Sequence, residues 1–172
     1  MKTQLCQSEI KEFIARIEAE LGLKEIVSKK DIVITEPSNF AEDISLIKVN
    51  NKPVFFSYKN KISPTLKAIL ELMNKHGQRY VEWLKTTKLK TITVDKGAVK
   101  FVVNGADIMR PGITSIDYGF DKDSFVIIID QEHKKPLAIG IALLNSEDMN
   151  SSAQGKVIKN IHYVGDEIWK MQ

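Results

Sequence analysis

The chain has 172 residues, a length that accommodates one large domain or two small ones. Apolar residues make up 43% and charged residues 27%, which is the balance of a globular protein and excludes a disordered chain. The net charge of +3 is too small to indicate a polyanionic partner by itself, and the single cysteine excludes an internal disulfide and a cysteine-rich zinc site.

No apolar stretch typical of a secretory signal follows Met1, and the longest apolar runs, at 125–129 and 137–144, are too short to cross a bilayer. A lone cysteine fits a reducing compartment. We therefore expect a cytoplasmic protein without a membrane partner.

The first predicted element is a helix over residues 8–21, with Ser8 as its cap and Gly22 as its end. Its apolar residues recur at helical spacing and form one stripe: Ile10, Phe13, Ile14, Ile17 and Leu21. Such a stripe predicts a helix packed on a core.

Short β-type runs follow at 31–35, 44–49 and 53–58. Asn50 and Asn51 separate the last two runs, and asparagine accepts the positive φ that a tight hairpin turn requires. A second helix is predicted to begin at Ser63-Pro64 and to end at Gly77, with a short helix within 78–88 after it.

Basic residues gather between the two halves of the chain, opposed there only by Glu82 and Asp95. They are Lys75, Arg79, Lys85, Lys88, Lys90, Lys96 and Lys100. This run is either a solvated connector or a surface that faces phosphate.

The second half, from Thr91 onward, consists of short Val/Ile runs punctuated by glycine and proline, a pattern typical of a small barrel or sandwich. We place the boundary near 88–90 and expect domains at 1–89 and 90–172. The predicted class is α+β, with an α/β domain followed by a mixed-β pseudobarrel.

Residues 94–112 carry the most specific pattern. Asp95 is expected to cap a helix over 96–103, with Ala98, Phe101 and Val102 on its buried face, and Gly105 is expected to end it. An extended stretch and a Pro111-Gly112 turn follow. A loop bounded by glycines exposes backbone N–H groups, which lets a phosphate or a flipped base approach closely.

This segment resembles the PUA domain, a small RNA-binding pseudobarrel, in its Lys-Gly-Ala, Asn-Gly-Ala-Asp-Ile-Met and Pro-Gly-Ile blocks. Residues 136–149 and 155–169 resemble the later strands of that domain. Residues 49–56 and 63–67 are similar to the domain that precedes PUA in the malignant T-cell amplified sequence family, which also has archaeal members. The segment 75–89 is longer and more basic than its counterpart in the eukaryotic members.

The resemblance implies a translation-associated protein that binds the 3′ end of transfer RNA, or ribosomal RNA, on the small ribosomal subunit. It also implies a possible protein partner that resembles density-regulated protein. The residues it nominates for RNA contact are Lys96, Lys100, Gly105, Ala106, Met109, Arg110, Pro111, Gly112 and Lys156. Backbone amides and a bidentate Arg110 would meet phosphate, and Met109 would support an unstacked base.

No catalytic or metal-binding set is recognisable. His76, His133 and His162 lack metal-ligand spacing, there is no phosphate-binding loop of the Walker type, and 121–130 lacks the ligand pattern of a calcium loop. We therefore predict a non-enzymatic protein without a cofactor.

Two other functions stay open. An interaction scaffold would use aromatic anchors such as Tyr80, Trp83 and the Phe55-Phe56 pair. A non-catalytic subunit of an RNA-modification complex would bind a modifying enzyme.

Overall fold

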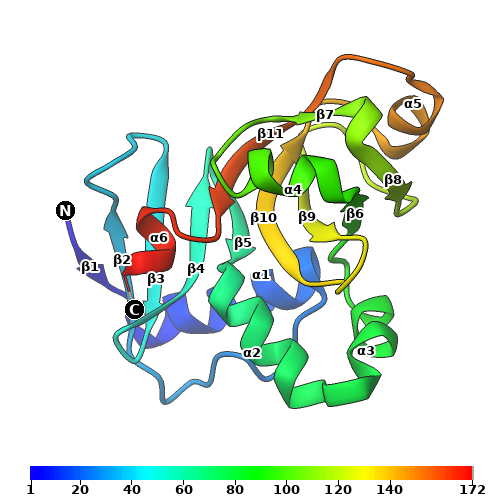
Figure 1. The fold of residues 1–172 in the computed structure, drawn as a ribbon. Helices are drawn as coiled ribbons and strands as arrows, with labels where there is room; N and C mark the ends of the chain where they lie inside the picture. Colours follow the sequence, from blue (N-terminus) through cyan, green and yellow to red (C-terminus); the bar gives the residue numbers. More distant parts are fainter. Residues whose placement is uncertain (172) are drawn as a thin grey trace. The chain divides into compact units, whose positions relative to one another are not determined.

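The structure is a computed structural model that describes residues 1–171, and it forms two compact units (Figure 1). Unit 1 is built from Met1–Lys88, and unit 2 from Leu89–Lys170. In the described part of the chain no helix is both long and apolar enough to span a membrane.

Unit 1 contains one antiparallel sheet with its strands in chain order. The strands are β1 (Thr3–Gln4), β2 (Val33–Pro37), β3 (Ile44–Val49), β4 (Lys52–Tyr58) and β5 (Lys61–Pro64). Asn50 and Asn51 join β3 to β4 with φ values of 50° and 70°, so the predicted hairpin is confirmed.

Three α-helices complete unit 1: α1 (Gln7–Leu21), α2 (Leu66–His76) and α3 (Tyr80–Thr86), with a 3-10 turn at Gly77–Arg79 between the last two. The apolar stripe of α1 is largely buried, and Phe13 meets Phe55 of β4 edge to face, with ring centroids 5.6 Å apart. Gly22 ends α1 with φ 65°, as the sequence predicts.

The predicted starts of both long helices were wrong. Cys6, not Ser8, precedes α1, and its N–H donates to the Glu9 carboxylate at 2.7 Å. Ser63-Pro64 belong to β5, at the edge of the sheet, where a missing N–H is tolerated. Thr65 caps α2 instead by accepting the N–H of Ala68 at 3.3 Å.

Unit 2 is a curled six-stranded sheet in the order β7-β11-β10-β9-β6-β8. Its strands are β6 (Thr91–Val94), β7 (Ile108–Met109), β8 (Ile113–Ile116), β9 (Phe125–Asp130), β10 (Pro136–Ala142) and β11 (Lys156–Tyr163). Its helices are α4 (Lys96–Val102), α5 (Ser146–Ser151) and α6 (Glu167–Lys170). The β6–β9 pair is parallel and the other pairs are antiparallel, which gives the predicted mixed-β pseudobarrel.

The curl depends on a close approach at Gly140 in β10. The β10–β11 register shifts at Ile139/Gly140, and a Cβ on Gly140 would stand 2.4 Å from Ile158 Cγ2. Only glycine allows β11 to pair so closely with β10 at this bulge, where the sheet bends around a core that includes Ile92, Ile128 and Met149.

Candidate nucleic-acid interface

Helix α4 is fixed at its start by Asp95. The Asp95 carboxylate accepts the N–H of Ala98 at 2.8 Å, and the Asp95 N–H donates to the Gly112 carbonyl at 2.9 Å. The predicted cap is therefore confirmed, and it ties the helix to the loop that returns past it.

Phe101 is exposed, although the sequence predicts it on the buried face of α4. Its exposed fraction is 57%, whereas Val102 is buried and Ala98 and Val99 pack against the core. The core lies toward Val99 and Val102, so Phe101 falls on the outer flank of the helix. Lys100 lies over its ring, with Nζ 5.0 Å from the ring centroid.

The backbone amides of the glycine turn after α4 are hydrogen-bonded within the protein. Gly105 has φ 87°, and its N–H donates to the Val102 carbonyl at 3.0 Å. The Ala106 N–H donates to Phe101 and the Arg110 N–H to Gly155, at 3.0 and 2.8 Å. These three amides, which the sequence nominates to meet phosphate, therefore already have partners within the protein: they cap the helix and join the sheet.

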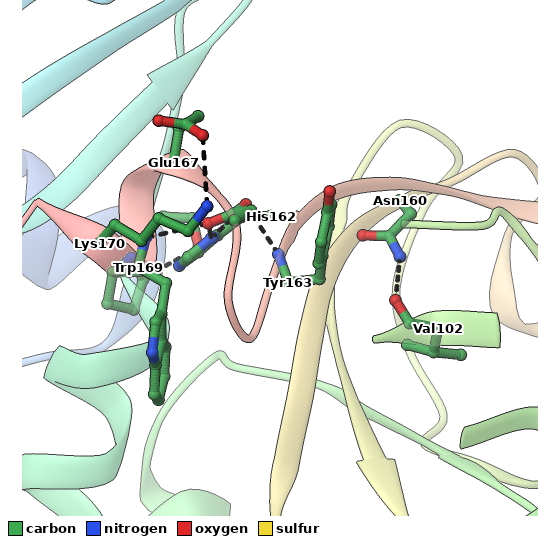
Figure 2. Close-up of polar contacts among 10 residues, drawn as sticks. Val102, Asn160, His162, Tyr163, Glu167, Trp169 and Lys170 are labelled. Atoms are coloured by element: carbon green, nitrogen blue, oxygen red, sulfur yellow. Dashed lines mark hydrogen bonds and ion pairs between the residues drawn. The ribbon is translucent and has the colours of Figure 1, made fainter. Parts of the chain in front are cut away.

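Strand β11 contacts the end of α4 and the glycine turn after it through Asn160, whose bond to Val102 is drawn in Figure 2. The Asn160 side-chain amide donates to the Val102 and Ala106 carbonyls, both at 3.0 Å, and its backbone N–H donates to Asp107 at 2.9 Å. The Asn160 Oδ1 atom is buried without a hydrogen-bond partner in the described chain. Asn160 thus positions the turn, and sequence reasoning missed it because its partners lie more than fifty residues away.

The Arg110 guanidinium is also hydrogen-bonded within the protein. Its Nε donates to the Met149 carbonyl at 2.8 Å, and its two terminal nitrogens reach Ile113 and Asn150 at 3.2 and 3.4 Å. Met149 and Asn150 belong to α5, so the guanidinium ties α5 to the loop after β7. This arrangement makes Arg110 a positioning residue.

The exposed basic and large apolar side chains of this region form a surface that we call the α4–β7 face: Lys96, Lys100, Phe101, Met109 and Lys156. Met109 is 51% exposed and pairs with Lys156 across the β7–β11 ladder. Lys156 lies 3.3 Å from Asp107, and Lys96 lies 3.9 Å from Glu132. Lys100 forms no ion pair with residues 1–171.

The remaining nominated residues shape this face. Pro111 and Ala106 are exposed, whereas Gly112 is half-buried, and a Cβ there would stand 3.1 Å from the Ala98 Cβ. The structure thus brings the nominated segment together, but presents side chains where main-chain amides were expected.

His162 has the structural role that the sequence predicts. Its side chain is buried, and Nδ1 lies 2.8 Å from Asp166, whose carboxylate also accepts the N–H groups of Tyr163 and Trp169 (Figure 2). Among residues 1–171 no three His, Cys, Asp or Glu side chains gather in a way that would hold a metal ion.

Residues 90–164 match the family model of the PUA domain. The chain is 31% identical to translation machinery-associated protein 20 of Saccharomyces cerevisiae over 86% of this chain and 76% of that protein. It is 32% identical to malignant T-cell-amplified sequence 1 of Rattus norvegicus over 89% of this chain and 78% of that protein.

A crystal structure of a hypothetical protein from the archaeon Pyrococcus horikoshii OT3 superimposes on 99% of the chain, and the chain covers 98% of that protein. The TM-score is 0.78 and the sequence identity is 35%. The similarity thus extends through both units and includes eukaryotic and archaeal proteins. The chain therefore belongs to the PUA-domain proteins of the malignant T-cell-amplified sequence family.

Proposed function

We propose that the protein binds RNA through the α4–β7 face and acts with the translation apparatus as a non-enzymatic, cytoplasmic factor. The observation that carries the proposal is an exposed aromatic ring, Phe101, flanked by Lys100 on a helix braced by the glycine turn. Family members named for the translation machinery support the cellular role.

The chemistry of this face favours an unstacked base over a duplex. An exposed Phe offers its ring to a base of any type, and such stacking contributes about 1–3 kcal/mol per base. Lys96, Lys100 and Lys156 supply salt-dependent attraction to the neighbouring phosphates. A single-stranded end, such as the 3′ end of transfer RNA, or a splayed ribosomal RNA base on the small subunit, fits this combination.

Titration of transfer RNA with and without its terminal CCA, across a salt series, tests the proposal. Phe101→Ala is expected to weaken binding by about 1–3 kcal/mol with little change in salt dependence. Lys100→Ala is expected to reduce the slope of log affinity against log salt by about 0.7.

Lys122→Ala is the matched control, because Lys122 is exposed on the loop before β9, outside the α4–β7 face. If transfer RNA and ribosomal RNA both fail to bind at low salt, or if Phe101→Ala binds as the parent does, the proposed site is wrong. Sedimentation of the tagged protein with small subunits then tests the ribosomal role.

A protein-interaction scaffold is the second candidate, favoured by a groove in unit 1 of about 630 Å³. Trp83 of α3 lines it and stacks on His76 with ring centroids 4.7 Å apart, whereas Phe55 and Phe56 are buried and offer no anchor. A partner resembling density-regulated protein would dock there. Recovery of one protein after nuclease treatment, lost in Trp83→Ala, favours this candidate.

A further inference from the structure

A second surface of unit 2 lies on the other flank of α4, away from Phe101. It is an open groove of about 600 Å³ between α4 and the turn that joins β9 to β10. Val99 of α4, Val103 directly after that helix and Leu137 of β10 form its floor, and all three side chains are half-buried. The floor is therefore aliphatic and partly open to water.

The rim of this groove is mostly basic. Lys96 and Lys100 stand on the α4 side, and Lys135 stands on the turn, with Glu132 as the exposed acid among them. Asp130 also borders the groove, but its two carboxylate oxygens accept the backbone N–H groups of His133 and Lys135 at 2.6 and 3.0 Å. The rim thus presents an excess of cations to an occupant.

The floor of the groove offers no polar side chain to a nucleobase. The amides of the turn are used within the protein: Gln131 donates to the Val94 carbonyl at 3.1 Å, and Lys134 donates to the Asp130 carbonyl at 3.1 Å. The aliphatic floor has no donor or acceptor. A base placed there would lose water from its polar edges without replacement, whereas an apolar side chain would not.

We propose that this groove binds a short peptide segment of a protein partner in which large apolar side chains are flanked by Asp or Glu. The apolar side chains pack on Val99, Val103 and Leu137, and the acidic flanks pair with Lys96, Lys100 and Lys135. The apolar floor selects the anchors, and the cationic rim rejects basic sequences, so both elements contribute to specificity.

One consequence rests on the proposed RNA function. Lys96 and Lys100 belong both to this rim and to the α4–β7 face, so an acidic peptide in the groove removes two cations from the RNA site. Peptide binding is expected to weaken RNA binding most at low salt, where those cations contribute most. Peptide binding itself does not require RNA binding.

The test starts from a random peptide library displayed on phage and panned against the intact, nuclease-treated protein. Enriched peptides are synthesised and titrated into the parent protein and into Lys135→Glu, Val103→Ser and Lys122→Glu. We expect sequences that combine large apolar residues with Asp or Glu, and an affinity about tenfold lower in the first two variants. Lys122→Glu carries the same charge change outside the groove and should bind as the parent does.

Nuclear magnetic resonance of the methyl groups locates the peptide, and shifts at Val99, Val103 and Leu137 are expected. The proposal is overturned if no sequence family is enriched, if the peptides lack acidic residues, or if Lys135→Glu binds equally well. It is also overturned if RNA, and not peptide, shifts these methyl signals. An RNA titration that fails while peptide binding succeeds rejects only the proposed RNA function.

Discussion

The ring of Tyr163 lies so close to Gly105 that a Cβ on the glycine would stand 2.8 Å from Cε1 of the ring. The glycine also has φ 87°, in the left-handed region. Two independent constraints therefore require glycine at this position: the backbone conformation of the turn and the ring beneath it.

Gly105→Ala should lower the free energy of unfolding by about 2–4 kcal/mol, because strain at positive φ adds to a clash with Tyr163. Gly119→Ala measures the strain at positive φ without a clash, since Gly119 has φ 88° and no atom lies within 4 Å of the place that its Cβ would take. Urea unfolding measures both losses. Equal losses in the two variants would contradict the clash, and Gly105→Ala should cost less stability in a Tyr163→Ala background than in the parent.

Asn160→Asp should destabilise unit 2 by about 2–3 kcal/mol, because a carboxylate would replace the amide that donates to the Val102 and Ala106 carbonyls. Asn104→Asp is the control, since Asn104 also donates to a carbonyl of α4, at 2.7 Å, but is exposed. Its effect should stay near 0.5 kcal/mol or below, roughly the range of surface substitutions. Thermal unfolding compares the two variants, and similar losses of stability would argue against the role of the Asn160 amide in holding the turn.

Arg110→Ala should destabilise the protein by about 1–3 kcal/mol, because carbonyls of α5 lose their donors. Hydrogen exchange of the amides in Ser146–Ser151 should accelerate, while Arg79→Ala, at an exposed position of unit 1, should leave it unchanged. If RNA affinity falls in Arg110→Ala without any change in stability or exchange, Arg110 contacts RNA directly and the positioning role is wrong.

Asp130 should make stability depend on pH in acid. Burial of its carboxyl raises the pKa, but the N–H groups of His133 and Lys135 outweigh this, so the pKa lies below its ordinary value. A group with a lowered pKa in the folded state contributes stability above its unfolded pKa of about 4, and this is lost as the pH falls through the folded value.

Urea unfolding across the acid range tests this dependence. Asp130→Asn should be less stable at neutral pH by about 1–3 kcal/mol and should lose less on acidification than the parent. Asp121→Asn, at an exposed position, should follow the parent curve. Parallel curves for the parent and Asp130→Asn would refute the role assigned to this carboxylate.

Local stereochemistry made much of the fold predictable. Gly22, Gly77 and Gly105 end helices at the expected places, and Asn50-Asn51 form the expected turn, because each position has a backbone requirement that few residue types meet. Such requirements can be recognised from neighbouring residues alone, without the tertiary structure.

The features that failed depend on distant partners. Ser63 and Pro64 pair with β4 as part of β5 and therefore lie outside the helix that the sequence predicts. Phe101 is exposed because the core lies on the other side of α4. The bonds of Arg110 to α5 and of Asn160 to α4 join residues about forty and sixty positions apart. No local pattern encodes such partners, so the roles of both residues became visible only in the fold.

Strand β11 supplies Asn160 and Tyr163, and it follows the turn that these residues support by about fifty positions. During synthesis on the ribosome, α4 and its turn therefore emerge well before their supports. A nascent chain that has not yet released β11 therefore lacks the side chains that brace α4 and its turn.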